Sequence, residues 1–489
     1  MSFLDAVKRL LAAKPIDVNE LNRRAIHSPE QSRPKAIAKD PLDGIQITDD
    51  YKAVRALLET GCPVVFLTGN AGTGKSTIIR YLRSVLDKKL VVVSPTGVAA
   101  LSAGGVTIHS FFHFPPKIHE EKDIKLVYDR RLYQQLQLLI IDEVSMVRCD
   151  LMDSIDKFLR KNRSNETPFG GVQLLLIGDL FQLPPVVPKH EWDVLTAKGY
   201  GSPYFFSSFS LQKLSLVPLE LTFIYRQEDR FFVDLLNRIR IGDDLDFVTG
   251  EVNRRCCQKD GFRPEITLTC TNVGADRINR NELGRLPSEE FCFKGKIEGK
   301  FSLEEDKLPS PIDLRLKVGA RVMFTKNDEQ RRWVNGTLGI VQEIDQRSIR
   351  VELVSESRGT VYDVLPVTWE TYKYAYDPEH DQIVANQVGR YTQHPLMLAW
   401  AVTIHKSQGK TLDNVFIDLG SGAFAFGQVY VALSRCRSIE GIQLARPIGK
   451  TDVKCDPVIK RFYLALAEMQ NERKGEQSVG GGSESADKS

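Results

Sequence analysis

Residues 69–76 read Gly69-Asn70-Ala71-Gly72-Thr73-Gly74-Lys75-Ser76, which matches the phosphate-binding pattern G-x-x-x-x-G-K-[ST]. A continuously apolar strand, Val64–Leu67, comes before this loop, and a helical stretch opens with Thr77 after it. The glycines let backbone N–H groups wrap around phosphates, and Lys75 offers a positive charge to them. Correct flanks on both sides argue against a chance match in a glycine-rich turn. We therefore expect residues 69–77 to bind a nucleotide, with the Ser76 hydroxyl on magnesium.

Strands and helices alternate around this loop from residue 51 to about 215. Three more strands, Leu90–Val93, Leu138–Ile141 and Leu174–Ile177, are continuously apolar, as strands buried on both faces should be. Between Asp150 and Arg163 the apolar residues follow the 3-4-3-4 spacing of one helix face. The sequence therefore predicts an α/β domain with a parallel sheet covered by helices.

A second α/β region begins near residue 216. Its candidate strands are Ile266–Cys270 and Val415–Leu419. Between about 311 and 393 the helical periodicity gives way to short β segments and an Asn335-Gly336 turn of the kind found in hairpins. The simplest interpretation is an all-β insertion within the second α/β domain.

Composition sets limits on the class of protein. The 489 residues allow roughly three domains, and 42% hydrophobic with 26% charged residues exclude a mostly disordered or fibrous chain. A formal net charge of +3 is too small to identify a nucleic-acid binder, so any DNA affinity must come from a local groove. No apolar run approaches the ~18 residues that span a bilayer, and no secretory segment is visible. We expect an intracellular protein, cytoplasmic and nucleoid-associated if the source is a prokaryote.

Cysteine and histidine spacing gives no sign of a zinc site or a redox pair. The eight cysteines contain no C-x-x-C pattern, and the eight histidines show no zinc spacing. Neighbouring Cys256 and Cys257 invite a redox interpretation, but reduced, structurally incidental thiols fit an intracellular chain better.

Acidic residues at two other strand ends distinguish between classes of nucleotide-binding protein. Asp142-Glu143 follows a buried strand, where the ligand crevice of a parallel sheet lies. Asp142 suits magnesium binding, and Glu143 suits activation of an attacking water, which a kinase does not need. Gln182 follows the next strand and is placed to sense the γ-phosphate, although a plain loop with a proline stop explains it equally well. The pattern favours hydrolysis over phosphoryl transfer.

Nine stretches follow the order of motifs in one known family. The chain resembles superfamily 1 helicases of the 5′→3′ branch, specifically the petite-integration-frequency (PIF-type) DNA helicases, with RecD-like enzymes as relatives. The resemblance covers about residues 47–445. The stretches are Gly69–Ser76, Thr96–Ala100, Thr107–Ser110, Asp142–Met146, Asp150–Leu174, Gly178–Pro185, Tyr225–Gln227, Leu398–Gly409 and Tyr430–Cys436.

The resemblance implies two RecA-like P-loop motor domains, a small wedge insertion and an all-β insertion of the Src-homology barrel type. The expected boundaries are an N-terminal helix and linker at 1–46, a first motor domain at 47–215 with its wedge at about 111–130, a second motor domain at 216–310 and 394–470, the β insertion at 311–393, and a disordered tail at 471–489. Arg226 and Arg435 are expected to reach the γ-phosphate from the second domain, and Gly409 to lie at the nucleotide. The alternative is that each arginine forms a surface ion pair.

The resemblance also implies a track for single-stranded DNA across both motor domains. Short hydrogen-bonding side chains are expected to grip the sugar–phosphate backbone, and these are Thr96, Thr107, His109, Thr403, His405 and Ser407. Local capping or turn formation is the competing explanation for each of them. Phe112 is a candidate for stacking on bases, and the apolar segment 111–116 is a candidate for the wedge that splits a duplex.

One position departs from the family pattern. Members usually place a glutamine before the first motor helix to read adenine, whereas this chain has Tyr51 there and Gln46 displaced. Stacking of Tyr51 on the base is the substitute that we expect.

The resulting expectation is a helicase that uses ATP and Mg²⁺ to move 5′→3′ on single-stranded DNA and to unwind forked or structured DNA. Two alternatives stay open. One is a non-unwinding translocase or a RecD-like subunit of a larger complex. The other is a binding module in which ATP merely switches DNA affinity.

Overall fold

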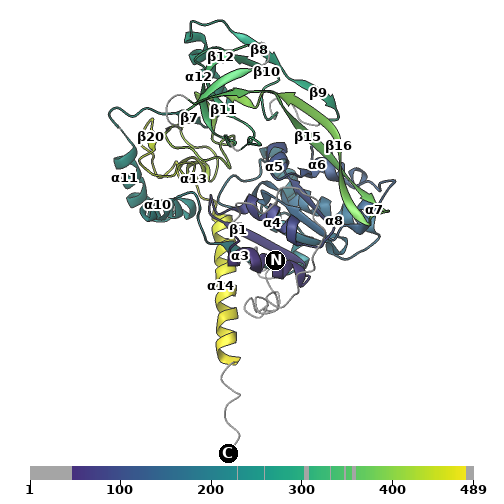
Figure 1. Ribbon diagram of the computed structural model, residues 1–489. Helices are drawn as coiled ribbons and strands as arrows, with labels where there is room; N and C mark the ends of the chain where they lie inside the picture. The colour runs from purple at the N-terminus through teal and green to yellow at the C-terminus, as the bar shows by residue number, and fades with distance from the viewer. Residues whose placement is uncertain are drawn as a thin grey trace, which may run out of the picture.

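The computed structural model describes residues 47–480, apart from positions 228, 258, 302–307, 331, 346–347 and 355–359. The expected N-terminal helix and linker at 1–46 lie outside the described residues. Two parallel sheets with their helices lie side by side, and an antiparallel β region extends over them (Figure 1). In the described part of the chain, no helix has the length and apolar character to span a bilayer.

The first sheet confirms the parallel sheet that the glycine-rich loop predicts. Its six parallel strands lie in the order β3-β2-β4-β5-β1-β6. Every residue of the three strands β1, β4 and β5 is buried, as expected for strands covered on both faces. The strands are β1 (Val64–Gly69), β2 (Leu90–Ser94), β3 (Val106–Thr107), β4 (Leu138–Ile141), β5 (Gln173–Ile177) and β6 (Leu216–Leu221).

Helices pack around this sheet to complete what we call the first lobe. The predicted helix after Asp150 is confirmed as α8, and its apolar face is buried at Leu151, Met152, Ile155, Phe158 and Leu159. The helices are α3 (Asp49–Glu59), α4 (Lys75–Val85), α5 (Gly97–Ser102), α6 (Ile108–Phe112), α7 (Arg131–Gln135), α8 (Cys149–Arg163) and α9 (Lys189–Ala197). Short 3-10 turns are η1 (Glu121–Asp123), η2 (Val144–Met146), η3 (Pro168–Gly171), η4 (Phe205–Ser207) and η5 (Leu211–Lys213).

The second lobe is built on a parallel sheet in the order β18-β7-β19-β20. Both predicted strands are present, as β7 (Ile266–Thr269) and β19 (Val415–Asp418). The other strands and the helices are β18 (Ala401–Thr403), β20 (Ile442–Leu444), α10 (Arg230–Ile241), α11 (Leu245–Cys256), α12 (Asn272–Arg285) and α13 (Gln428–Leu433).

Two elements cross the predicted boundary between the lobes. β6 begins after residue 215, yet it pairs with β1 along its whole length, from Leu216 opposite Val64 to Leu221 opposite Gly69. The boundary at 215 is therefore wrong, because β6 forms the edge of the first sheet, where its Pro218 is tolerated.

The final helix, α14 (Pro457–Gly480), also belongs partly to the first lobe (Figure 1). Phe462 and Leu466 are buried in the core formed with β1, and the hydroxyl of Tyr463 lies 2.7 Å from Oγ1 of Thr68. The assignment of 394–470 to the second domain alone is wrong for this helix. The tail expected from 471 is likewise helical as far as Gly480.

The β insertion forms a five-stranded antiparallel sheet in the order β14-β13-β12-β11-β17. It extends beyond the predicted 311–393, because β17 pairs with β11, and β8 pairs with β10. Asn335-Gly336 forms a turn within the longer connection between β11 and β12 rather than joining them directly. The strands are β8 (Phe291–Lys294), β10 (Asp313–Leu316), β11 (Arg321–Phe324), β12 (Leu338–Ile344), β13 (Ile349–Leu353), β14 (Val361–Val364) and β17 (Leu396–Leu398).

A long hairpin leaves this β module and reaches the first lobe (Figure 1). It consists of β15 (Val367–Asp377) and β16 (Gln382–Gln393), with β9 (Lys296–Gly299) at its edge. Near its tip, Asp381 pairs with Lys89 at 2.5 Å. Tyr374 is buried in the first lobe's core, with its ring 6.0 Å from that of Phe111. The insertion therefore bridges the two lobes.

Candidate active site

The loop between β1 and α4 has a backbone that favours glycine at three positions. Gly69, Gly72 and Gly74 have φ angles of 156°, 85° and 85°. A Cβ at Gly72 would lie 2.6 Å from Cβ of Arg226, so the close approach of the second lobe also requires glycine there. Gly74 precedes α4, whose first N–H groups lack partners within the helix. The loop is shaped to approach an anion with its backbone.

The first half of the loop already contacts the second lobe. Asn70 Nδ2 donates to Oδ1 of Asn237 on α10 at 2.9 Å. The Ala71 N–H donates to the hydroxyl of Tyr430 on α13 at 3.0 Å. Thr73 is buried and its hydroxyl donates back to the carbonyl of Asn70. The predicted phosphate loop therefore lies at the junction of the two lobes.

The Lys75 side chain folds onto its own loop. Its Nζ donates to the carbonyls of Gly69 at 2.7 Å and Asn70 at 2.8 Å. Burial lowers the pKa of Lys75, while neighbouring carboxylates oppose that shift. The backbone N–H of Thr77 donates to the Gly74 carbonyl. The neighbouring residue Ser76 is exposed to solvent. An exposed hydroxyl next to an ammonium without a direct ion-pair partner among the described residues is suited to a nucleotide phosphate and its cation.

Asp142 and Glu143 lie where the sequence predicts, at the carboxyl end of β4. Asp142 Oδ1 accepts from the N–H of Glu143 at 3.0 Å, and Glu143 has a left-handed backbone with φ 53°. Burial, reinforced by the charge of Glu143, raises the pKa of Asp142 to about 7. Burial also raises the pKa of Glu143. Two crowded carboxylates with raised pKa values are suited to a bound cation or a proton-transfer step.

A glutamine from the second lobe joins the catalytic candidates of the first. Gln408 Nε2 donates to Oε1 of Gln182 at 3.1 Å and to Oε2 of Glu143 at 3.3 Å. Gln182 in turn donates from its Nε2 to Oδ2 of Asp179 at 3.1 Å. Gln182 is therefore part of a network that crosses the lobe junction, rather than a member of a simple surface loop.

Arg226 and Arg435 come together on the second lobe's side of the junction. Arg226 donates to the Thr411 hydroxyl, the Ser434 carbonyl and the Gly409 carbonyl, at 3.0, 3.1 and 3.4 Å. Arg435 is 1% exposed and donates to the Val431 carbonyl and the Ser434 hydroxyl.

Neither arginine has a carboxylate within ion-pair distance in the described part of the chain, which removes the alternative of surface ion pairs. Burial, reinforced by the charge of Arg226, lowers the pKa of Arg435 to about 9, while Glu143 opposes that shift. Two adjacent cations without a counterion are suited to an anionic ligand.

Tyr51 does not take the base-stacking role that its position predicts. Its side chain is 2% exposed and packs against Tyr81, and its hydroxyl donates to the carbonyl of Gly74 at 2.9 Å. It supports the loop from behind. Tyr225 is instead the exposed aromatic beside Gly74, and its ring carbon lies 3.4 Å from a Cβ built there. The position of Tyr225 directly before the predicted arginine finger Arg226 is the sequence feature that could have indicated an aromatic residue at the nucleotide site.

The predicted DNA-contacting hydroxyls have local partners, as the competing explanation requires. Thr96 and Thr107 cap α5 and α6, and Thr403 accepts from the N–H of Lys406. Ser407 is completely buried and donates to the Ile404 carbonyl, so its side chain is not accessible to a strand. His109 and His405 are partly exposed, and burial lowers the pKa of His405.

Phe112 does not fit the prediction of base stacking. It is 1% exposed and packs in an aromatic cluster with Phe111, Phe114 and Phe158. The apolar segment 111–116 is therefore mainly core, because its phenylalanines bury α6 against α8. The exposed apolar side chains of the predicted wedge region are Leu126 and Tyr128.

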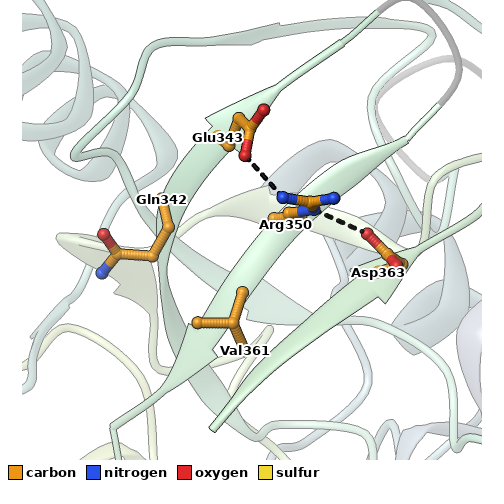
Figure 2. Close-up of a pocket in the computed structure, with 5 residues that line it drawn as sticks. All are labelled: Gln342, Glu343, Arg350, Val361 and Asp363. Carbon is orange, nitrogen blue, oxygen red and sulfur yellow. Dashed lines mark hydrogen bonds and ion pairs between the residues drawn. The ribbon is translucent and has the colours of Figure 1, made fainter. Parts of the chain in front are cut away.

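An open cavity of about 390 Å³ lies away from this site, on the outer face of the β module. Figure 2 shows Arg350 between Glu343 and Asp363, with which it forms ion pairs at 2.7 and 3.1 Å. The charged side chains of the cavity pair with one another, and none of its lining residues belongs to the nucleotide site. Gln342 and Val361 complete its lining.

Comparisons with known proteins agree with this geometry. The family model described as PIF1-like helicase matches residues 47–246. The ATP-dependent DNA helicase PIF1 of Homo sapiens is 34% identical over 469 residues, which cover 93% of this chain and 69% of the human protein.

Two solved structures of Bacteroides Pif1 are similar to this chain, each at 35% identity. The complex with ADP-AlF4 has a TM-score of 0.79 and covers 88% of this chain and 98% of that one. The complex with ssDNA has a TM-score of 0.63 and covers 87% and 98%. On sequence and on fold, the chain belongs to the PIF1-like helicase family.

Proposed function

We propose that this protein is an ATP-dependent DNA helicase that binds ATP between its two lobes. The observation that carries the proposal is the pair of arginines on the second lobe's side of the junction. Arg226 lies against Gly72 of the phosphate loop, and the charge of Arg435 interacts with that of Glu143. Among the described residues, neither arginine has a carboxylate within ion-pair distance. An arginine that stabilises the charge on the γ-phosphate oxygens accelerates hydrolysis about 10³-fold or more. Hydrolysis therefore requires both lobes.

Each residue of the junction has a distinct role in this proposal. Lys75 exchanges its bonds to loop carbonyls for bonds to the outer phosphates. Glu143 orients and deprotonates the attacking water, and Gln182 senses the γ-phosphate through the network that Gln408 completes. The Tyr225 ring stacks on the base in place of Tyr51.

Mg²⁺ is the cation that fits the donors at this site. The exposed Ser76 hydroxyl and the Asp142 carboxylate are hard oxygen donors of the kind that Mg²⁺ prefers. Bound Mg²⁺ would neutralise charge that develops on the phosphates. Asp142 and Ser76 are the residues that would hold it.

The nucleic-acid ligand that we propose is single-stranded or forked DNA. A relative of known structure has been crystallised with ssDNA, and the lobes of this chain share its fold. Thr107 and Thr403 are the last residues of β3 and β18, Thr96 directly precedes α5, His109 lies in the first turn of α6, and His405 follows β18. We expect a sequence-independent grip on phosphates at these strand ends, with Thr403 buried and the others at least partly exposed. ATP bound between the lobes would draw them together while each lobe holds the DNA strand. Cycles of ATP binding and hydrolysis would therefore move the protein stepwise along the strand. The direction we propose, from the family resemblance, is 5′→3′.

The test is the rate of ATP hydrolysis with and without single-stranded DNA, followed by unwinding of forks that carry either a 5′ or a 3′ tail. We expect DNA to stimulate hydrolysis and the 5′-tailed fork to be unwound. Stimulated hydrolysis without unwinding would favour the non-unwinding translocase. DNA binding that responds to ATP without turnover would favour the ATP-switched binding module.

A further inference from the structure

A buried ion pair joins the lobes next to the phosphate loop. Arg240, on α10 of the second lobe, donates to Oδ1 of Asp179 at 3.1 Å from one terminal nitrogen and at 3.3 Å from Nε. Asp179 is 1% exposed and Arg240 is 9% exposed. The guanidinium also lies over the ring of Phe181, 4.6 Å from its centre. Arg240 lies in none of the nine family-like stretches.

The charge of Asp179 also bears on Lys75 of the phosphate loop. Among the charges that oppose the lowering of the Lys75 pKa, that of Asp179 is the largest, ahead of Glu143 and Asp142. Yet Lys75 makes its hydrogen bonds to loop carbonyls and not to Asp179. Two cations from different lobes thus lie near one buried carboxylate, and Arg240 is the one that contacts it.

We propose that Arg240 is a positioning residue that engages Asp179 and so keeps Lys75 available for nucleotide phosphate. Without Arg240, the buried Asp179 charge would lack its ion-pair partner, and Lys75 is the nearby cation able to replace it. An ion pair between Lys75 and Asp179 would compete directly with phosphate. Because Arg240 belongs to the second lobe, the contact between the lobes then sets the nucleotide affinity of the first.

The other partners of Asp179 reinforce this role. Tyr430 of the second lobe donates to its Oδ2 at 3.4 Å and accepts from the Ala71 N–H of the phosphate loop. Gln182 donates to the same Oδ2 and leads through Gln408 to Glu143. A displaced Asp179 would therefore disturb both the loop and the hydrolytic network. The inference rests on the proposed nucleotide site and adds to it a residue that controls phosphate affinity.

The experiment is a double-mutant cycle that neutralises the two charges singly and together and measures the binding of fluorescent ADP to the full chain. For Arg240→Met we expect the Kd to rise about tenfold or more, since a buried charge loses its partner. For Asp179→Asn together with Arg240→Met we expect the Kd to return to within about threefold of the unmodified protein, because the competitor for Lys75 is gone. Arg238→Ala is the matched control, since Arg238 is on the same helix but pairs with Asp234 at the surface.

A purely structural role for Arg240 predicts the opposite pattern, in which the double variant binds as weakly as Arg240→Met or more weakly. That result would overturn the inference. If Arg240→Met fails to fold, Asp179→Asn alone is a second test. The inference requires the Asp179→Asn variant to bind ADP at least as tightly as the unmodified protein. Weaker binding would overturn it. DNA-stimulated hydrolysis by the unmodified protein tests the proposed function separately, so the two failures are distinguishable.

Discussion

Glu143 holds its carboxylate at the lobe junction through an unusual backbone, with φ 53°, at the end of β4. Glu143→Gln preserves the shape and an acceptor for Gln408 but removes the base. We expect ATP to bind while hydrolysis falls about 10²- to 10⁴-fold, the range for loss of a general base. Single-turnover hydrolysis and ATP retention on a filter measure the two effects.

Glu166→Gln is the control for that substitution, because Glu166 lies at the surface of the same lobe and is paired with Arg160. It should leave turnover unchanged. Unchanged hydrolysis in Glu143→Gln would rule out the role assigned to Glu143 and would leave Asp142 as the residue to test.

Lys410 is a second residue whose surroundings predict a measurable effect. Its ammonium contacts the sulfur of Met323 at 3.2 Å, and burial lowers its pKa from 10.5 to about 8. The unfolded chain therefore binds the proton more tightly than the native state. The buried ammonium lowers the free energy of unfolding at pH 7, and this destabilisation disappears as the pH rises from about 8 towards 10.5. Lys410→Met should stabilise the protein at pH 7 by up to about 3 kcal/mol.

The thermal midpoint measured from pH 7 to pH 10 checks this prediction. The advantage of Lys410→Met should shrink steadily across that range, whereas the exposed control Lys198→Met should show no such trend. An advantage that stayed constant with pH would mean that packing against Met323, and not charge, is responsible.

At the scale of elements, burial changes which side chain of the wedge region can contact DNA. The phenylalanines of 111–116 are core, while Tyr128, between η1 and α7, is fully exposed. If this region splits the duplex, Tyr128 is the aromatic placed to stack on a base. Tyr128→Ala should lower fork unwinding about tenfold while DNA-stimulated hydrolysis stays intact, since base stacking on an aromatic is worth roughly 1–3 kcal/mol.

A control for Tyr128→Ala comes from the same region. Phe112→Ala removes a buried ring and should lower the free energy of unfolding by about 3–5 kcal/mol, reducing both activities together. Loss of hydrolysis and unwinding together in Tyr128→Ala, with the melting temperature unchanged, would contradict a wedge role for this side chain.

The sequence predicts elements well where burial on both faces leaves an apolar run, as in β1, β4, β5 and the amphipathic α8. It fails where a pairing partner is distant. β6 contains Pro218, which is unfavourable in most strands, so the local sequence does not predict a strand there. The position of β6 is set by its pairing with β1. In the β15–β16 hairpin, nothing in the local sequence indicates that Tyr374 enters the first lobe's core.

The same limit applies to the site. The spacing of the glycine-rich loop and the Asp142-Glu143 pair specify chemistry through contiguous residues, so their placement could be predicted. The roles of Arg240 and Gln408 depend on contacts with the opposite lobe, and that of Tyr51 depends on its packing against Tyr81 and the loop backbone within the first lobe. Only the folded chain shows these contacts. Residues that act across the junction are therefore the ones that motif-based reasoning misses or assigns to the wrong role.

For the whole molecule, the junction makes catalysis a property of two lobes rather than one. Arg226 packs against Gly72 of the phosphate loop but hydrogen bonds to Thr411 and Ser434 of the second lobe. Arg226→Ala should therefore leave the loop able to bind nucleotide while kcat for hydrolysis falls about 10³-fold, the lower end of the range for an arginine finger. Arg437→Ala, on the exposed side of the same lobe and paired with Asp413, should leave kcat unchanged. A loss of nucleotide affinity with kcat unchanged in Arg226→Ala would instead assign Arg226 to ground-state binding, because an interaction made only in the transition state changes kcat alone.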